Sequence, residues 1–230
     1  MTEFTEWRSL VDGERITGIP DSVADQTVHL YDARELSLSN NDTVSSLPDL
    51  EGSNDLSADG DPTFDTSGIN ENPAVFYDGD DAHESSSISV SSYPITVIAV
   101  VSLDTINDRH TVIQMEEGGS NYIQYRDDNS EWFIFGGSDG ISGSSDTTVQ
   151  LVTAIFDDDD SEFREDGSQT ATGNVGSRDA DVLYLGGDRG DFGPRRELIG
   201  HIGLARVIDG TVPTEDLQEY ESQLISEWGI

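Results

Sequence analysis

Short runs of apolar and β-branched residues recur along the chain from Val28 onward, and turn-forming Gly, Asp, Asn and Pro residues separate them. The run from Ile95 to Leu103 is almost entirely apolar or β-branched, which is typical of a strand buried on both faces. The other runs are short, as in "NPAVFYDGDD", "YIQYR" and "EWFIFG". Many short strands joined by such turns predict an all-β sandwich of two antiparallel sheets.

Four consecutive aspartates, residues 157–160, follow one of these apolar runs directly. Such a stretch has three interpretations: a metal site, a disordered acidic linker, or a turn. We expect a strand over Thr148–Phe156, a hairpin loop at Asp157–Ser161, and a return strand that begins at Glu162–Arg164 and leads to the Asp166–Gly167 turn. The aspartates are therefore interpreted as a solvated turn in an acidic protein.

The clearest helix comes last, in "PTEDLQEYESQLISEWGI". Pro213–Thr214 gives a start signal, with Thr214 as the expected N-cap residue and acidic residues in the first turn. Gly229 marks the end. One face of this helix is apolar, and it carries Leu217, Tyr220, Leu224, Ile225 and Trp228.

The first 27 residues are polar with scattered apolar anchors. We expect residues 1–27 to form an N-terminal arm and residues 28–230 to form the sandwich domain. Phe4, Trp7 and Leu10 are the candidate anchors by which the arm docks on a neighbouring protein. A short helix in this segment is the alternative.

The chain has 230 residues, with 47 acidic and 11 basic residues and a formal net charge of −36. All the basic residues are arginine, since the sequence contains no lysine. Such a surface repels itself in dilute buffer, and molar salt screens that repulsion. The composition therefore indicates a salt-adapted protein, like those of halophilic archaea or their viruses, with an ordinary acidic secreted protein as the alternative.

Charge and composition also exclude classes of function. Nucleic acid is not an expected partner, because phosphate binding needs clustered arginine or lysine. The absence of cysteine excludes disulfides and thiolate metal sites. No apolar run is long enough to cross a membrane, and the N-terminus lacks the pattern of a signal peptide.

Several short motifs occur in a fixed order between residue 28 and residue 230. They are Tyr31–Asp32–Ala33, Pro73–Ala74–Val75, Tyr77–Asp78–Gly79, Asp166–Gly167, Gly186–Gly187, Gly200 with Ile202, Thr214–Glu215, and Trp228–Gly229. This ordered series resembles the concanavalin A-like lectin/glucanase superfamily, and within it the laminin-G-like domains. Leu30 and Leu47 stand where tryptophans are frequent in that family, and Tyr77 replaces the usual Phe.

The resemblance implies a two-sheet antiparallel jelly-roll sandwich with a short C-terminal helix. It also makes calcium the expected ion, since laminin-G-like domains often bind it through carboxylate and carbonyl oxygens. The candidate ligands are Asp78, Asp80 and Asp81, with Glu84 next to them; a solvated acidic turn is the alternative.

Glycosidases of this superfamily carry a Glu-x-Asp-x-x-Glu pattern on one strand, and the runs expected to be strands lack it. We therefore expect a protein that is not an enzyme, with a secreted glycoside hydrolase as a minor alternative. The four histidines are scattered and do not form a zinc pattern.

The leading hypothesis is a carbohydrate-binding adhesion module on the outside of a virion or cell, such as a capsid decoration, turret or tail protein of a virus of halophilic archaea. Its partners would be other virion or surface proteins and host surface glycans, within a homo-oligomeric assembly in a high-salt environment. Loops at one end of the sandwich are the expected sugar site, with Tyr184, Arg189 and Phe192 as candidates. A purely structural spacer is the second hypothesis.

Overall fold

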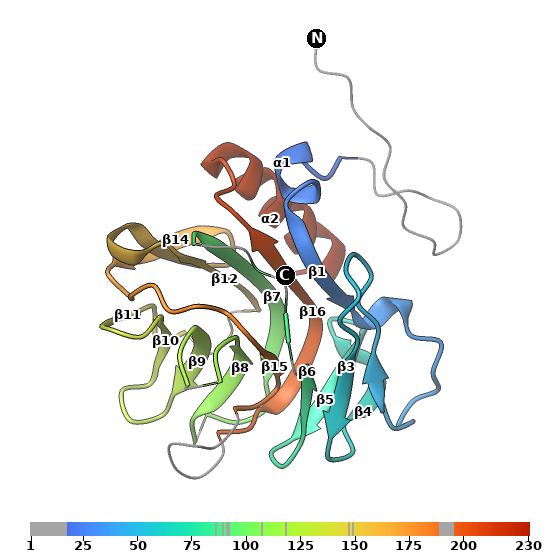
Figure 1. The fold of residues 1–230 in the computed structure, drawn as a ribbon. Helices are drawn as coiled ribbons and strands as arrows, with labels where there is room; N and C mark the ends of the chain where they lie inside the picture. The colour runs from blue at the N-terminus through green and yellow to red at the C-terminus, as the bar shows by residue number, and fades with distance from the viewer. Residues whose placement is uncertain are drawn as a thin grey trace.

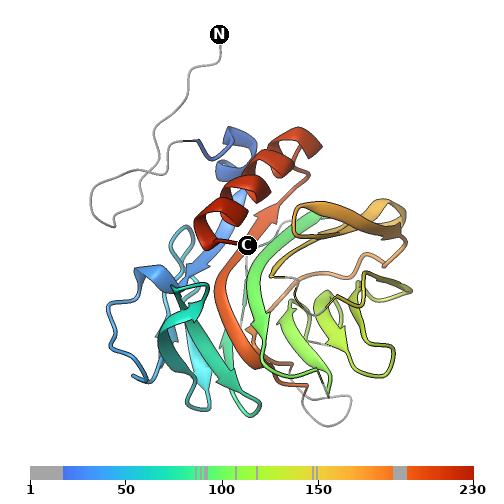
Figure 2. The ribbon, with the colours of Figure 1, turned by 180° about the vertical axis from the view of Figure 1, so that it is seen from behind.

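The computed structural model describes residues 18–85, 87–88, 90, 93–106, 108–117, 119–146, 148, 150–188 and 196–230. These residues form two antiparallel sheets packed face to face, with a C-terminal helix on the outside (Figures 1 and 2). The predicted fold class, a two-sheet antiparallel sandwich with a C-terminal helix, is confirmed.

The first sheet, sheet A, is built around its longest strand, β16 (Ile199–Asp209). One edge of β16 pairs with β7 (Ile95–Leu103) over its whole length. The other edge pairs with β5 (Asn72–Asp78) in its first half and with β1 (Thr27–Asp32) in its second half. The remaining strands are β4 (Thr63–Ile69) beyond β5, and β12 (Leu151–Phe156), β13 (Ser161–Glu165) and β14 (Ser168–Gly173) beyond β7.

The second sheet, sheet B, has the order β11-β10-β9-β8-β15-β6-β3-β2 among the described residues. Its strands are β11 (Gly140–Ser142), β10 (Glu131–Phe135), β9 (Tyr122–Arg126), β8 (His110–Gln114), β15 (Leu183–Leu185), β6 (Ala82–Ser85), β3 (Leu56–Asp59) and β2 (Ser46–Leu47). Three short helices complete the fold: α1 (Asp21–Ala24), η1 (Ala33–Glu35) and η2 (Asp158–Asp160).

Strand β7 shows why the run from Ile95 to Leu103 is apolar throughout. Its alternate residues Val97, Ala99 and Val101 face sheet B and belong to the core between the two sheets. Ile98 and Val100 face the other way, into a second core that sheet A forms with the C-terminal helix α2 (Thr214–Trp228). The predicted burial of this strand on both faces is confirmed.

Helix α2 lies across sheet A (Figure 2) and buries the predicted residues Leu217, Tyr220, Leu224 and Trp228. Gly229 ends it with a left-handed backbone (φ 67°), as expected. The N-cap prediction is wrong: Pro213 holds that position and Thr214 is already helical, without a side-chain cap. The extended backbone of Pro213 starts the helix, since its carbonyl accepts the hydrogen bond from the Leu217 N–H.

The acidic stretch forms the predicted hairpin. Asp158–Asp160 make the single turn η2 between β12 and β13, and Asp166–Gly167 make the next tight turn, both residues with positive φ. Strand β12 begins at Leu151 and not at Thr148, because the Asp146 carboxylate accepts hydrogen bonds from the Thr148 N–H and hydroxyl and holds Thr148 in a turn. The interpretation of "DDDD" as a turn is confirmed.

The described part of the N-terminal segment packs on the sandwich. Helix α1 contacts α2, and Val23 is fully buried in the core beneath that helix. The Ser22 hydroxyl donates to the Asp216 carboxylate at 2.6 Å. The candidate anchors Phe4, Trp7 and Leu10 lie outside the described residues.

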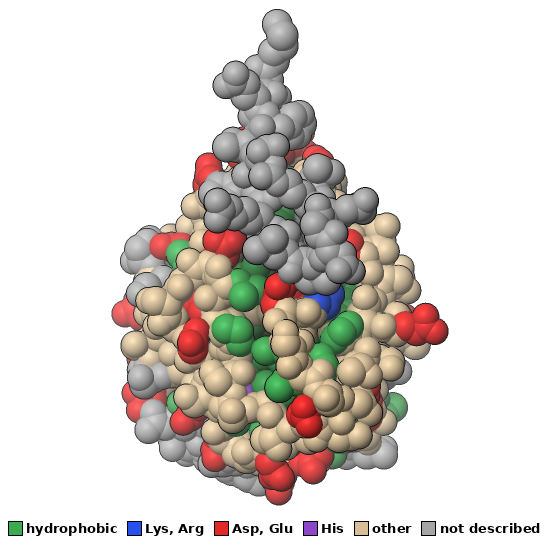
Figure 3. Space-filling view, turned by 90° about the vertical axis from the view of Figure 1, so that its right-hand side faces the viewer, with side chains coloured by type: hydrophobic (Ala, Val, Ile, Leu, Met, Phe, Trp, Pro, Cys, Tyr) green, Lys and Arg blue, Asp and Glu red, His purple; other side chains and the backbone are tan. Residues whose placement is uncertain are grey.

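Acidic side chains are spread over the face shown in Figure 3, while basic side chains are confined to one small area. Of the described large apolar side chains, Leu38, Leu50 and Ile106 are the most exposed. Among the described helices, none has the length and apolar character needed to cross a membrane.

Candidate functional site

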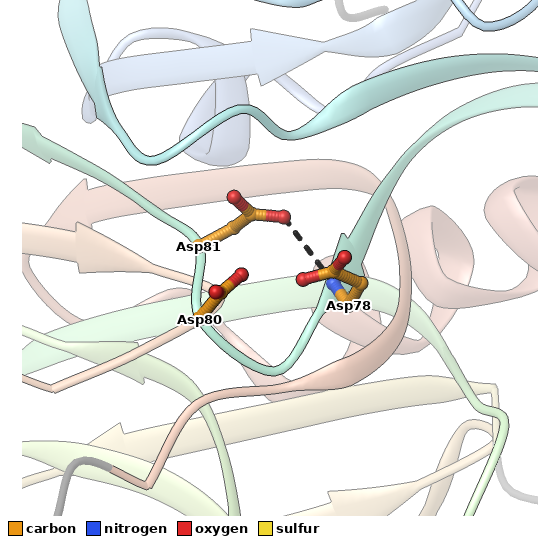
Figure 4. Close-up of side chains that lie close together, drawn as sticks. All are labelled: Asp78, Asp80 and Asp81. Atoms are coloured by element: carbon orange, nitrogen blue, oxygen red, sulfur yellow. Dashed lines mark hydrogen bonds between the residues drawn. The ribbon is translucent and has the colours of Figure 1, made fainter.

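The three predicted metal ligands meet in the turn between β5 and β6 (Figure 4). One carboxylate oxygen from each of Asp78, Asp80 and Asp81 lies within 4.8 Å of the others, and the carboxyl groups point into a common space. Gly79 allows this turn, because its φ of 104° is open to glycine and strained for other residues. The structure therefore brings the three predicted ligands together, while their role as calcium ligands stays a prediction.

Asp81 is the anchored member of the cluster. It is 3% exposed, and its two oxygens accept hydrogen bonds from the Asp61 N–H at 2.7 Å and the Asp78 N–H at 3.3 Å. Gly60 leaves room for it, since a Cβ there would lie 2.3 Å from the Asp81 Oδ1 atom. Burial raises the pKa of Asp81, and the charges of Asp78 and Asp80 raise it further.

Asp80 is exposed, as is Asp78, and the carboxyl groups of the two residues interact. A hydrogen bond with the Asp78 carboxyl group, and then the charge of that group, raises the pKa of Asp80. Carboxylates that repel one another in this way gain the most from a cation placed between them. The three side chains have the oxygen chemistry of a calcium site, with the buried Asp81 fixed and Asp80 free to adjust.

The predicted sugar ligand Tyr184 lies in a short strand, just before the glycine pair Gly186–Gly187. It is part of β15, where it pairs with Gln114 of β8 and with Glu84 of β6, and it is 6% exposed. The run around it forms a central strand of sheet B because β6 and β8 flank it on both edges. The other two candidates, Arg189 and Phe192, lie outside the described residues.

The expected cluster of end loops is formed in part. A Cβ on Gly187 would lie 3.1 Å from the Ala82 Cβ atom and 3.6 Å from the Asp81 carbonyl oxygen, so the chain after β15 adjoins the acidic turn. The Ser138–Ser145 segment, another loop expected at the sugar site, contains β11 at the far edge of sheet B, five strands away from β6. It therefore belongs to a different part of the surface.

An aromatic group on the outer face of sheet B was missed by the sequence analysis. Tyr122 of β9 and Phe133 and Phe135 of β10 point away from the core, since the alternating residues Ile123, Trp132 and Ile134 belong to it. The ring centroids are 5.5 Å apart for Tyr122 and Phe135, 6.1 Å for Tyr122 and Phe133, and 6.4 Å for the two phenylalanines. We call these three residues the aromatic platform.

Strand β11, beside the platform, leaves room for one of its rings. Gly140 of β11 pairs with Phe135, and a Cβ on this glycine would lie 2.0 Å from the Phe133 Cζ atom. The absence of a side chain lets the Phe133 ring extend over the neighbouring strand. The three platform residues are partly exposed.

Polar side chains border the platform. The Arg126 guanidinium lies over the Phe133 ring, 4.4 Å from its centroid, and Gln124 stands directly across from Phe133 in the register. Burial raises the pKa of Tyr122, and the positive charges of Arg196, Arg126 and Arg109 oppose that rise. Aromatic rings with adjacent amide and guanidinium groups can stack on a sugar ring and bond its hydroxyl groups.

The signal for this platform was present in "EWFIFG". After its first residue, a glutamate, the strand "EWFIF" contains only aromatic and aliphatic residues. Because side chains alternate between the two faces of a strand, both faces carry apolar side chains. An outward face that is aromatic, next to "YIQYR", is therefore a candidate binding surface.

Solved structures with the same β-sandwich come from carbohydrate-active and toxin proteins. Domain 4 of an extracellular arabinanase from Geobacillus stearothermophilus, in complex with arabinotriose, is 13% identical with a TM-score of 0.63, over 84% of this chain and 97% of that one. Trypanosoma rangeli sialidase in complex with sialic acid is 13% identical with a TM-score of 0.65, over 97% and 36%. Botulinum neurotoxin type C, described as interacting with two ganglioside molecules for cell entry, is 12% identical with a TM-score of 0.63, over 88% and 52%.

At these identities the likeness shows the fold. The chain corresponds to almost the whole arabinanase domain, to about a third of the sialidase chain and to about half of the neurotoxin chain. No protein-family model matches the sequence, and no curated protein sequence matches it significantly.

Proposed function

We propose that this protein is a non-catalytic module that binds carbohydrate on the outer face of sheet B. The observation that carries the proposal is the aromatic platform of Tyr122, Phe133 and Phe135, three neighbouring and partly exposed rings on one face of a rigid sheet. Sugar rings present apolar C–H faces that stack on such rings, and bordering polar groups orient them. The arabinanase domain of the same fold, solved in complex with arabinotriose, supports this use of the sandwich.

The runs expected to be strands lack the Glu-x-Asp-x-x-Glu pattern of the superfamily's glycosidases, which supports a non-catalytic role. We expect no release of reducing ends when oligosaccharides are incubated with the protein.

A glycan array in molar KCl tests the proposal. The wild-type protein is compared with Phe133→Ala and with Phe76→Ala, a matched control that removes a partly buried phenylalanine from sheet A. We expect binding by the wild type and by the control, and loss of binding for Phe133→Ala. If wild-type protein binds nothing on the array, the proposal is wrong and a purely structural role is left.

The wider setting is a virion or cell surface in high salt, with the protein as an adhesion component in a homo-oligomeric assembly on other surface proteins. The charge of −36 and the absence of lysine support the salt-adapted part of this proposal. Purification of virus particles from cultures of halophilic archaea, followed by detection of the protein in the particle fraction, tests the setting. Detection in the cytoplasmic fraction alone would contradict it.

Calcium at Asp78, Asp80 and Asp81 is part of the proposal. The buried, doubly hydrogen-bonded Asp81 and the mutual repulsion within the cluster support it. The ion would fix the turn between β5 and β6 beside the segment that follows β15.

A further inference from the structure

Among the described arginines, Arg126 and Arg206 each have a buried Nε atom without a hydrogen-bond partner and a guanidinium that lies over an aromatic ring. Arg206 in addition donates to the Thr27 hydroxyl. Arg164 donates hydrogen bonds through all three of its guanidinium nitrogens, and Arg34 likewise. The Arg126 Nε atom is buried and has no hydrogen-bond partner among the described residues. Its ion pair with Asp128 is loose, at 3.6 Å, and the same carboxylate group accepts a hydrogen bond from Arg109.

An arginine with so few polar contacts is unexpected in a chain of this composition. Acidic residues outnumber arginines by 47 to 11, so a carboxylate partner is available to almost any guanidinium. Apart from the loose pair with Asp128, Arg126 contacts the Phe133 ring, with its guanidinium carbon 4.4 Å from the ring centroid. This contact helps to hold the guanidinium beside the platform.

Gln124 lies two residues earlier on the same face of β9, and it also has a polar side-chain atom without a partner. Its side chain is 1% exposed, and its Nε2 donates to the Thr111 hydroxyl at 2.9 Å, which fixes the amide. The Oε1 atom of the same amide is buried without a hydrogen-bond partner among the described residues. Buried polar atoms in native proteins are almost always hydrogen-bonded, to protein, to water or to a ligand.

We propose that the aromatic platform, Arg126 and Gln124 together bind a sugar that carries a carboxylate or a sulfate group. The sugar ring stacks on the platform, its anionic group accepts hydrogen bonds from the Arg126 fork, and one hydroxyl donates to the Gln124 Oε1 atom. Arg109 and Arg196 also act on Tyr122, but Arg109 is paired with Asp127 and Asp128, and Arg196 with Asp188. Arg126 is therefore the guanidinium assigned to the anionic group. The short-range hydrogen bonds of a guanidinium to an oxyanion persist in salt that screens longer-range attraction.

This inference rests on the proposed carbohydrate-binding function and adds the charge of the ligand to it. A neutral glycan would use the platform and Gln124 without Arg126. The two ideas are therefore separable by comparing sugars that differ only in the anionic group.

Titration calorimetry in molar KCl provides the test. The probes are oligogalacturonate and a sulfated galactan oligosaccharide, each paired with its carboxyl-reduced or desulfated form. The proteins are wild type, Arg126→Gln, Arg126→Lys, Phe133→Ala, and Arg178→Gln as a matched control that removes an equal charge from a largely exposed side chain paired with Glu116. Thermal melting of each variant verifies that it is folded.

We expect the wild type to bind at least one charged probe about tenfold or more tightly than its neutral form. Arg126→Gln should remove that preference, Arg126→Lys should restore part of it, and Arg178→Gln should leave it unchanged. Equal binding of charged and neutral forms, with no effect of Arg126→Gln, overturns this inference and leaves the proposed function standing. Failure of every probe and of the neutral forms counts against both.

Discussion

The guanidinium of Arg164 in β13 donates hydrogen bonds to both carboxylate oxygens of Glu221 in α2, at 2.9 to 3.0 Å. Both side chains are almost completely buried. The same guanidinium also donates to the Glu162 carboxylate and to the Gly167 carbonyl oxygen. One arginine thus ties the C-terminal helix to the acidic hairpin at the edge of sheet A.

Removal of one partner of this pair is expected to be costly. Glu221→Ala leaves a buried guanidinium without its main partner and should lower the free energy of unfolding by about 3–5 kcal/mol. Asp128→Ala, which breaks the exposed pair with Arg109, serves as the control and should have a much smaller effect. Urea unfolding in molar KCl measures both, and equal effects would show that the buried pair has no special role.

The indole of Trp228 lies against the backbone of Gly203 in β16. A Cβ on Gly203 would come within 2.3 Å of the ring, so Gly203→Ala forces the helix end away from the sheet. We expect a loss of about 1–3 kcal/mol of unfolding free energy. In the double variant with Trp228→Leu the cost of the added methyl group should largely disappear, and strict additivity of the two changes would contradict the contact.

His83 should make stability depend on pH. Its Nε2–H donates to the Val44 carbonyl oxygen at 2.8 Å, so its Nδ1 accepts from the Tyr77 hydroxyl at 3.0 Å, and burial lowers the pKa of this neutral ring to about 4. The unfolded-state pKa is ~6.5, so the unfolded state takes up the proton first as the pH falls. This residue should therefore contribute a loss of stability of about 3 kcal/mol between pH ~6.5 and ~4, and none above that window.

The variant His83→Gln isolates this contribution. The difference in unfolding free energy between wild type and variant should change with pH inside the window and stay constant above it. Chemical denaturation at constant ionic strength gives both curves. A His83 titration near pH 6.5 in the folded protein, followed by NMR, would refute the assignment.

The surface charge should make the fold depend on salt. With a net charge of −36, self-repulsion is unscreened in dilute buffer and falls off within about 3 Å in 1 M salt. We expect the melting temperature to rise steeply between dilute and molar KCl. An equally high melting temperature in dilute buffer would remove the case for a salt-adapted protein.

Calcium should stabilise the protein at fixed ionic strength. The melting temperature is expected to rise with added CaCl₂ in molar KCl for the wild type, and not for Asp80→Ala or Asp81→Asn. Because Asp78 raises the pKa of Asp80, and burial raises that of Asp81, protons compete with the ion and the effect should weaken as the pH is lowered. Asp139→Ala, a change in a different exposed turn, is the control and should respond like the wild type.

Residue patterns predicted the strands, the acidic hairpin, the helix face and the Asp78–Asp81 cluster, because each depends on local periodicity or turn chemistry. The aromatic platform could not be predicted in this way. In "EWFIF" aromatic or aliphatic side chains occupy both faces of the strand, so the sequence does not show which of them face the core. Tyr184 was proposed as a sugar ligand at the end of its strand, and its near-complete burial depends on β6 and β8, which flank it and are distant in sequence. The lack of a hydrogen-bond partner for the Arg126 Nε–H group could be recognised only from the positions of all its neighbours.

Strand β16 has a consequence for how the chain folds during synthesis. It occupies the centre of sheet A, and its partners β1, β5 and β7 all leave the ribosome many residues earlier. Until residues 199–209 emerge, those three strands have exposed edges and no common neighbour, a condition that favours aggregation and slows folding. The dense negative charge then has a second benefit, because it keeps such unfinished chains apart while they wait for their central strand.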